Sequence, residues 1–252
     1  MSGVPTMVGT IERRLLINYR VDPEVLQRLL PPPFRPQEVA GMGMAGICLI
    51  RLGHLRPAGL PSTMGLRTEN AAHRVAVEWD CPEGPCRGVY IPRRDTSSRL
   101  TVLLGGRLFP GEHHRAQFRV HEGSGRYEVA LKSLDGSAHV AVTARTVPSL
   151  ASGSCFASLE EASTFFEGAP LGYSATHRPG RYEGLELGCA EWRVEPLVVE
   201  HAESSYFEDQ ALFPAGAVEL DSALLMRDIP ASWQARDPIA NVSSVEQVAP
   251  CG

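Results

Sequence analysis

The hydrophobic residues of this chain recur mostly at every second position, which is the repeat of a β-strand with one buried face. Val75, Val77 and Trp79 show the repeat clearly, because they share one face of the segment 74–79. The segments 126–133 and 138–146 are joined by an Asp-Gly pair, which is typical of a hairpin turn. The pattern predicts strands at 12–20, 46–56, 74–79, 87–92, within 115–147, at 186–200 and at 217–227.

Three short helices are predicted from their capping residues. Asp22-Pro23-Glu24 supplies an N-cap, a first-turn proline and a first-turn acid, and Pro31-Pro32-Pro33 ends that helix. Ser158-Leu159-Glu160-Glu161 is a capping box that opens a second helix. Asp95 or Thr96 can cap the third, which runs through Leu100, Leu103 and Leu104 to Gly105-Gly106.

The balance of nine or ten strands and three short helices predicts an α+β protein with a curved or barrel-like, mainly antiparallel sheet. Strands and helices do not alternate, so a doubly wound sheet is excluded. We expect one domain over residues 1–252, with a core at about 10–235 and a tail at 236–252 that lacks apolar periodicity.

Composition removes several classes of function. The net charge of −5 argues against a nucleic-acid-binding protein, which needs a basic surface. No apolar run approaches the roughly 18 residues of a membrane span. The N-terminus lacks the pattern of a signal peptide, so we expect a cytoplasmic protein with no membrane partner. Nucleotide-binding glycine motifs, a G-x-S-x-G motif and an H-E-x-x-H motif are absent from the sequence, and no cofactor is expected.

The six cysteines are expected to be free thiols in a reducing cytoplasm. Cys81 and Cys86 bracket a Pro/Gly-rich turn, and their spacing differs from the C-x-x-C of zinc and redox sites. We therefore interpret this segment as a loop.

The basic residues are unevenly divided, because only Lys132 among the 24 is a lysine. A codon bias explains such a skew without any function. The consequence for chemistry is the same, since arginine stays protonated and cannot act as an amine nucleophile.

Three segments together resemble the acetoacetate decarboxylase-like superfamily, and in particular its YqjF-like branch. They are, in chain order, Leu16-Ile17-Asn18-Tyr19-Arg20-Val21-Asp22, Gly88-Val89-Tyr90-Ile91-Pro92-Arg93-Arg94-Asp95, and Trp192-Arg193-Val194-Glu195-Pro196-Leu197 running into Phe213-Pro214. The resemblance covers about residues 10 to 235. It implies a cone-like β-barrel around a small-molecule cavity, and homo-oligomers.

The resemblance also implies roles for particular residues. The decarboxylases hold the substrate carboxylate with an arginine that matches Arg20. They carry a Pro-Lys-Lys stretch whose lysine forms a Schiff base, and here that stretch reads Pro92-Arg93-Arg94. Imine chemistry is therefore excluded at this position. Lys132 shares a strand face with Glu128 and Ala130, opposite a more apolar face, so we expect it to point to solvent.

Each candidate residue has a structural alternative. Arg20 can hold a ligand carboxylate or pair with Asp22 or another carboxylate. Arg93 and Arg94 can bind substrate, with at most one facing the cavity on an extended strand, or they can flank a capped helix. Glu69 and His73 can move protons or belong to a polar loop. His114, or its neighbour His113, is expected to face the cavity.

The two adjacent histidines also suggest a metal site with His73 and Glu69, but we expect none. We predict that the protein binds a small carbonyl or carboxylate compound, with Glu69, His73 and His114 as catalytic residues and Arg20, Arg93 and Arg94 as substrate-binding residues. The expected step is enolisation, dehydration or a related lyase or isomerase reaction without a Schiff base. The alternatives are a binding or sensing protein without turnover and imine chemistry through Lys132.

Overall fold

The computed structural model describes residues 4–104 and 110–240, which form a single 13-stranded sheet with a few short helices. The helices are α1 (Pro23–Leu29), α2 (Arg99–Leu104) and α3 (Leu159–Glu167), with one 3-10 turn at Ser62–Met64. The strands are β1 (Met7–Val21), β2 (Arg35–Pro36), β3 (Glu38–Val39), β4 (Met42–Pro57), β5 (Leu66–Cys81), β6 (Gly84–Thr96), β7 (His114–Gly123), β8 (Arg126–Ser133), β9 (His139–Thr146), β10 (Leu171–Ala175), β11 (Arg181–Cys189), β12 (Glu195–Ser204) and β13 (Val218–Ala240).

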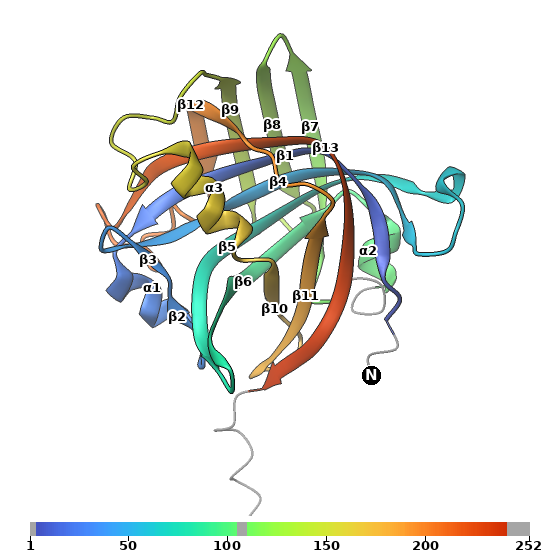
Figure 1. Cartoon of the computed structure of the whole chain (residues 1–252), viewed down its shortest axis with the longest axis horizontal. Coiled ribbons are helices and arrows are strands. Elements are labelled where there is room, and N and C mark those ends of the chain that lie inside the picture. Colours follow the sequence, from blue (N-terminus) through green and yellow to red (C-terminus); the bar gives the residue numbers. More distant parts are fainter. Residues whose placement is uncertain (1–3, 105–109, 241–252) are drawn as a thin grey trace, which may run out of the picture.

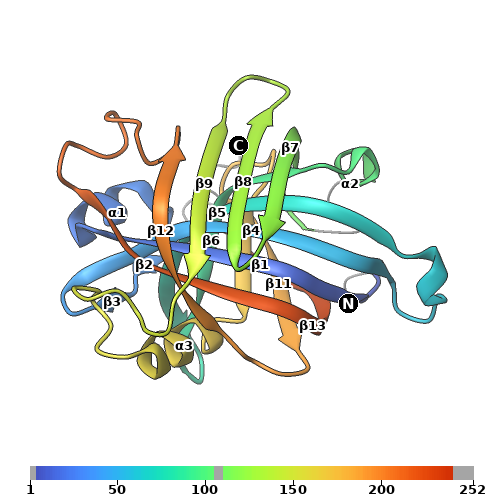
Figure 2. The same cartoon turned by 90° about the horizontal axis from the view of Figure 1, so that it is seen from above.

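Five long strands, β13, β1, β4, β5 and β6, pair in that order and are shared by two closed rings of strands. On one side β10 and β11 close the first ring, because β10 pairs with β6 and β11 pairs with β13. On the other side β7, β8, β9 and β12 close the second ring between β6 and β13 (Figures 1 and 2). Closure of this kind leaves few exposed sheet edges.

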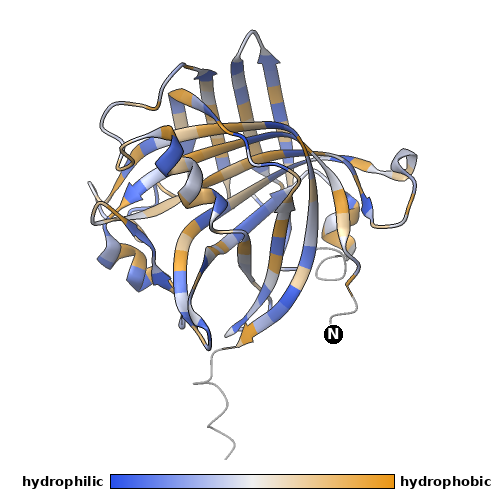
Figure 3. Ribbon diagram, in the orientation of Figure 1, coloured by the Kyte–Doolittle hydropathy of each residue, from blue (hydrophilic) through white to orange (hydrophobic). Residues whose placement is uncertain are grey.

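Alternation along the shared strands sends neighbouring residues into different rings. On β1, Leu15 and Ile17 join the large apolar cluster that fills the second ring, whereas Leu16 packs toward α3 with Phe166. Hydrophobic and hydrophilic residues accordingly alternate along the ribbon in Figure 3. Each shared strand therefore has two buried faces, and polar side chains on them become buried as well.

The predicted N-caps of α1 and α3 are confirmed. Asp22 caps α1 by accepting a hydrogen bond from the Glu24 amide, and the helix ends at Leu29, before the proline run. Ser158 caps α3 by accepting from the Glu161 amide. The α2 cap differs from the prediction. Asp95 and Thr96 still belong to β6, and Ser98 accepts from the Thr101 amide instead. The predicted glycine end of α2 lies outside the described residues.

The strand predictions are confirmed for the Asp-Gly hairpin between β8 and β9, and Lys132 on β8 is exposed as expected. The predicted strand 186–200 is two strands, β11 and β12, and β10 was not predicted. The last strand, β13, continues through residues 236–240, which were predicted to belong to a tail. These residues pair with β11, and backbone ladder hydrogen bonds of this kind require no apolar periodicity.

The expectation that all six cysteines are free thiols is wrong for one pair. Cys81 and Cys86 form a disulfide across the β5–β6 turn. Cys86 pairs with Trp79 and Cys81 pairs with Gly84, so the two cysteines are diagonal neighbours in the hairpin, with their Cα atoms 5.8 Å apart. Cys48, Cys155 and Cys189 are the free cysteines of the described part of the chain.

The described helices are short, and none of them has the length and apolar character needed to cross a membrane.

Candidate functional site

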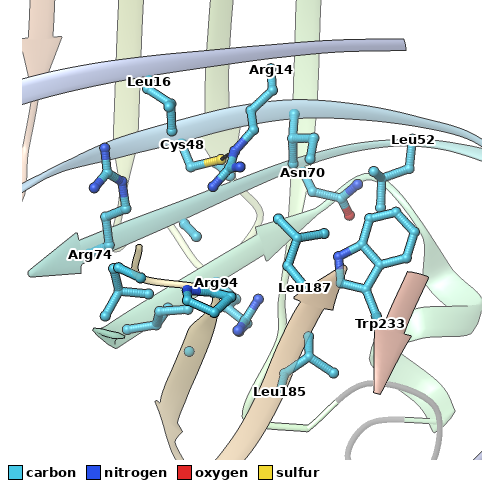
Figure 4. Close-up of a pocket in the computed structure, with 18 of the residues that line it drawn as sticks. Arg14, Leu16, Cys48, Leu52, Asn70, Arg74, Arg94, Leu185, Leu187 and Trp233 are labelled. Atoms are coloured by element: carbon cyan, nitrogen blue, oxygen red, sulfur yellow. Dashed lines mark hydrogen bonds between the residues drawn. The ribbon is translucent and has the colours of Figure 1, made fainter. Parts of the chain in front are cut away.

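A cavity of about 150 Å³ lies inside the first ring (Figure 4). Its wall is mostly apolar and includes Leu16, Ile50, Leu52, Val89, Ile91, Phe165, Phe166, Leu185, Leu187 and Trp233. Its polar residues are Arg14, Cys48, Asn70, Arg74, Arg94, Asp95, Thr101 and His113. The cavity is thus a small apolar space with a cationic wall, which is the usual form of a small-molecule site.

Three arginines from three shared strands line this cavity. Arg14 lies on β1, Arg74 on β5 and Arg94 on β6. Arg14 and Arg74 are each followed by a residue, Leu15 and Val75, that belongs to the apolar cluster of the second ring. Because neighbouring residues of a strand point to opposite faces, Arg14 and Arg74 face the first ring. Figure 4 shows the three side chains around the same space.

Arg14 contacts sulfur atoms. It donates from Nε to Cys48 Sγ over 3.3 Å and from Nη1 to Met226 Sδ over 3.6 Å. Its guanidinium carbon also lies 5.9 Å from the centre of the Trp192 ring. These are weak acceptors for a full positive charge, so Arg14 gains little electrostatic compensation from them.

Arg74 is buried, with 4% of its surface exposed. It donates to Asn18 Oδ1, its guanidinium carbon lies 4.8 Å from the Phe166 ring centre, and its Nε has no partner among the described residues. The neighbouring position Gly46 has to be glycine, since a Cβ there would lie only 2.4 Å from Ile17 O on β1. Burial lowers the pKa of Arg74 to about 10, so it remains charged at neutral pH.

Arg94 donates from Nε to Ser174 Oγ on β10 over 2.7 Å. Burial lowers its pKa to about 10 as well. The pKa values of Arg74 and Arg94 are lowered because each cation is buried away from water without a strong counter-charge.

No carboxylate of the described residues lies within ion-pair distance of Arg14, Arg74 or Arg94. Other arginines of the same strands are paired: Arg13 with Glu69 and Arg93 with Asp95. Asp95 also borders the cavity, but both its oxygens accept from Arg93. The cavity wall therefore carries uncompensated positive charge, and a small anion inside it would supply the missing partner.

His113 is a histidine whose side chain lines the cavity. Its pKa is lowered to about 3, by burial first and then by Arg94, so the ring is neutral at pH 7. Nδ1 lies 3.2 Å from Gly111 O. Because a carbonyl only accepts, Nδ1 carries the proton in this contact.

The structure separates the two arginines that replace the lysine pair of the decarboxylases. Arg94 lies opposite Ala72 and faces the cavity, whereas Arg93 lies opposite His73, donates to Asp95 and Ser137, and does not line the cavity. The register of β5 and β6 shifts next to Pro92. This bulge puts Ile91 and Arg94, three residues apart, on the same face.

Arg20 does not reach the cavity. It is six residues from Arg14 on β1, which corresponds to about 20 Å of strand. It donates from Nε to Glu219 over 2.9 Å and from Nη1 to Gly153 O over 2.8 Å. This placement matches the structural alternative, a strand-end arginine bound to a carboxylate.

Glu69 and His73 lie on the face of β5 opposite the cavity. Glu69 accepts from Arg13 over 2.6 Å and from Arg51 over 2.5 Å. His73 is fully buried, its Nε2 lies 3.1 Å from Ser204 Oγ, and burial lowers its pKa to about 3. The structure therefore places neither residue where it can contact a ligand in the cavity.

His114 also lies outside the cavity, with Nδ1 3.1 Å from Asp135. Of the two adjacent histidines, only His113 faces inward. In the described part of the chain, no group of three His, Cys, Asp or Glu side chains lies close enough together to hold a metal ion.

Sequence reasoning missed Arg14, Arg74 and Cys48 as site residues. The alternation placed Arg74 with Ala76 and Glu78 on the strand face opposite Val75, Val77 and Trp79. That face is polar at one end and encloses the cavity at the other, which a local repeat cannot reveal. The sequence shows only that the small residues Ala72 and Ala76 flank Arg74 on this strand face, and this pattern does not by itself indicate a cavity.

The family model DUF2071, described as an uncharacterized conserved protein, matches residues 9–224. The chain belongs to the DUF2071 family. No curated protein matches the sequence of this DUF2071 chain.

Solved structures with the same fold are similar to this DUF2071 chain along nearly its whole length. The enduracididine biosynthesis enzyme MppR complexed with pyruvate matches with a TM-score of 0.59 and 12% identity, over 94% of this chain and 91% of that one. The acetoacetate decarboxylase from Legionella pneumophila matches with a TM-score of 0.57 and 14% identity, over 94% and 87%.

An acetoacetate decarboxylase-like enzyme from Sphingomonas wittichii RW1 matches with a TM-score of 0.56 and 11% identity, over 96% of this chain and 94% of that one. The resemblance inferred from the three sequence segments is confirmed, and with it the β-rich fold class. Identities this low establish the fold alone, so the function of this DUF2071 chain has to be argued from its own cavity.

Proposed function

We propose that this protein binds a small carboxylate or carbonyl compound in the cavity bordered by Arg14, Arg74 and Arg94. One observation carries the proposal: three buried or half-buried guanidinium groups converge there without a carboxylate partner among the described residues. A guanidinium fork matches a carboxylate and strengthens in a site shielded from water.

The size and lining of the cavity narrow the ligand class. Its volume of about 150 Å³ is close to that of an engineered cavity that holds benzene, so it fits a compound of roughly five to eight heavy atoms. The apolar wall of Leu185, Leu187 and Trp233 favours a short carbon chain behind the anionic head. MppR, which shares the fold, has been solved with pyruvate, a compound of this class.

Binding is tested by calorimetric titration with pyruvate, 2-oxobutanoate and the unbranched carboxylates from acetate to hexanoate. We expect Arg94→Gln to weaken binding by about tenfold or more, because it removes a charge-assisted contact worth about 1.5–3 kcal/mol. Arg20→Gln is the matched control. It removes another arginine that the sequence predicted to bind substrate, but one that contacts Glu219 and not the cavity, so binding should stay unchanged.

Arg14→Gln provides a second cavity variant if Arg94→Gln unfolds. The proposal fails if both cavity variants bind as the wild type does, or if Arg20→Gln alone abolishes binding. Thermal unfolding of every variant establishes that a loss of binding reflects the site.

The reaction that these cavity residues support is enolisation or a related lyase or isomerase step without a Schiff base. Arg94 would stabilise a developing enolate oxygen. Proton transfer was predicted for Glu69, His73 and His114, but His113 is the histidine that borders the cavity. His113 would therefore carry out this role. Exchange of the C3 protons of 2-oxobutanoate in D₂O, followed by NMR, measures this step directly.

A second candidate is binding or sensing without turnover. Two observations favour it: the His113 pKa of about 3 makes that ring a weak base, and the Asp95 carboxylate is bound to Arg93. Tight binding with no proton exchange above the buffer rate supports this candidate, and exchange that disappears in His113→Gln supports the enzyme. Homo-oligomers and a cytoplasmic location remain predictions. Whether Cys81 and Cys86 are oxidised to a disulfide or reduced to thiols depends on the redox poise of the compartment.

A further inference from the structure

Cys48 is a free thiol in the wall of the cavity. It lies on β4, its residue is 7% exposed, and its sulfur accepts the Nε hydrogen of Arg14 over 3.3 Å (Figure 4). A hydrogen bond from a guanidinium gives the sulfur an electropositive surrounding, the setting in which reactive cysteines are found.

The other two arginines of the cavity act on the same sulfur. Cys48 is close enough to Arg74 and to Arg94 that it raises the pKa of each. Arg74 is 4% exposed and its Nε has no partner among the described residues. The site therefore combines a thiol with buried cationic groups, and these groups favour the binding of an anionic ligand next to the thiol.

The two remaining free cysteines of the described chain have different surroundings. Burial raises the pKa of Cys155, and Asp221, to which it is hydrogen-bonded, raises it further. Burial also raises the pKa of Cys189, Arg14 opposes this increase, and Glu167 adds to it. Each of these thiols has a carboxylate as well as an arginine nearby, whereas Cys48 has arginines alone, so the two serve as internal comparisons.

We propose that Cys48 is the nucleophile of the cavity and forms a covalent adduct with a small anionic electrophile, of the class of 2-oxo acids, whose carboxylate is held by Arg74 and Arg94. The inference rests on the proposed function, since it requires that the cavity bind carboxylates. It offers this fold a covalent chemistry that needs no lysine.

The addition balances without a further reactant. The Cys48 sulfur forms a bond to the ketone carbon of the 2-oxo acid as the C=O π bond breaks. The thiol proton ends on the former ketone oxygen, which gives a thiohemiketal, and no group is oxidised or reduced. With iodoacetate the sulfur–carbon bond forms as the carbon–iodine bond breaks, iodide leaves, and the thiol proton passes to solvent.

Alkylation of the wild-type protein with iodoacetate and, separately, with neutral iodoacetamide tests the proposal. Peptide mass spectrometry follows the rate at each cysteine. We expect Cys48 to react at least tenfold faster with iodoacetate than with iodoacetamide, and Cys155 and Cys189 to show no such preference. Propionate, an unreactive anion of similar size, should slow alkylation at Cys48 alone.

Arg94→Gln should remove the preference for iodoacetate at Cys48, and Cys48→Ser should remove the corresponding modified peptide. A second readout is NMR of pyruvate labelled with ¹³C at its carbonyl carbon. A resonance of a tetrahedral carbon bound to sulfur should appear with the wild type and be absent with Cys48→Ser.

The outcomes separate this inference from the proposed function. If calorimetry detects carboxylate binding that depends on Arg94, but Cys48 shows no preference for iodoacetate and no pyruvate adduct, the nucleophile assignment is overturned and the binding proposal stands. If no carboxylate binds and propionate protects nothing, both fall together.

Discussion

Arg94 on β6 donates a hydrogen bond from Nε to Ser174 Oγ on β10 over 2.7 Å. The contact crosses the parallel pairing that closes the first ring, since β10 and β6 are neighbours there. It therefore fixes the direction of one cavity arginine and links the closure of the barrel to the site.

Ser174→Ala should weaken carboxylate binding by about threefold to tenfold and lower the free energy of unfolding by about 1–3 kcal/mol. The reason is that the substitution leaves a buried charged donor without its acceptor. Calorimetric titration and urea unfolding measure the two effects. Unchanged affinity together with unchanged stability would show that the hydrogen bond does not position Arg94.

Lys132 should form no imine with a small ketone. Its side chain is exposed on β8, while its neighbours Val129 and Leu131 face the core of the second ring. A Schiff-base lysine needs desolvation or a cationic neighbour, and an exposed side chain has no desolvation. Borohydride reduction in the presence of pyruvate, followed by mass spectrometry, checks this. A reduced adduct on Lys132 would restore imine chemistry as a candidate.

Glu69→Gln should destabilise the protein without changing carboxylate affinity. Glu69 bonds Arg13, whose side chain is 2% exposed, and Arg51, so the substitution leaves buried positive charge less compensated. The expected loss is about 1–3 kcal/mol in the free energy of unfolding, because Glu122 still pairs with both arginines. Urea unfolding gives the loss and calorimetry the affinity. A tenfold loss of affinity in a folded variant would return Glu69 to the site.

The folded protein should lose stability as the pH falls below about 6.5. Burial lowers the pKa of His73 to about 3 in the folded state, against 6.5 when unfolded, so between these values the unfolded chain alone binds the proton. Stability is then fully present above pH 6.5 and falls by up to about 1.4 kcal/mol per pH unit for this one group.

The contribution of His73 is separated by comparing variants from pH 4 to 7. His73→Phe keeps a ring against Tyr206, 4.9 Å from the His73 ring centre, and should reduce the slope of unfolding free energy against pH by about one proton. His201→Gln, at an exposed position, should leave the slope unchanged. Equal slopes in the wild type and His73→Phe would contradict a neutral, buried His73.

The amino-acid sequence by itself determined the local elements and one chemical exclusion. Asp22 and the proline run fix α1, the Asp-Gly pair fixes the β8–β9 hairpin, and alternation places Lys132 outward. Each of these depends on residues that are close along the chain. Arginine in place of the lysine pair excludes the Schiff base whatever the tertiary structure, because the guanidinium stays protonated.

Only the tertiary structure decided which side chains share the cavity. Alternation assigns Arg13 and Arg14 to opposite faces of β1, but the long-range pairing of β11 with β13 decides that the Arg14 face encloses a cavity. The bulge beside Pro92 decides that Arg94, and not Arg93, points into it. Strand closure and register depend on contacts between distant segments, so the local repeat carries no information about them.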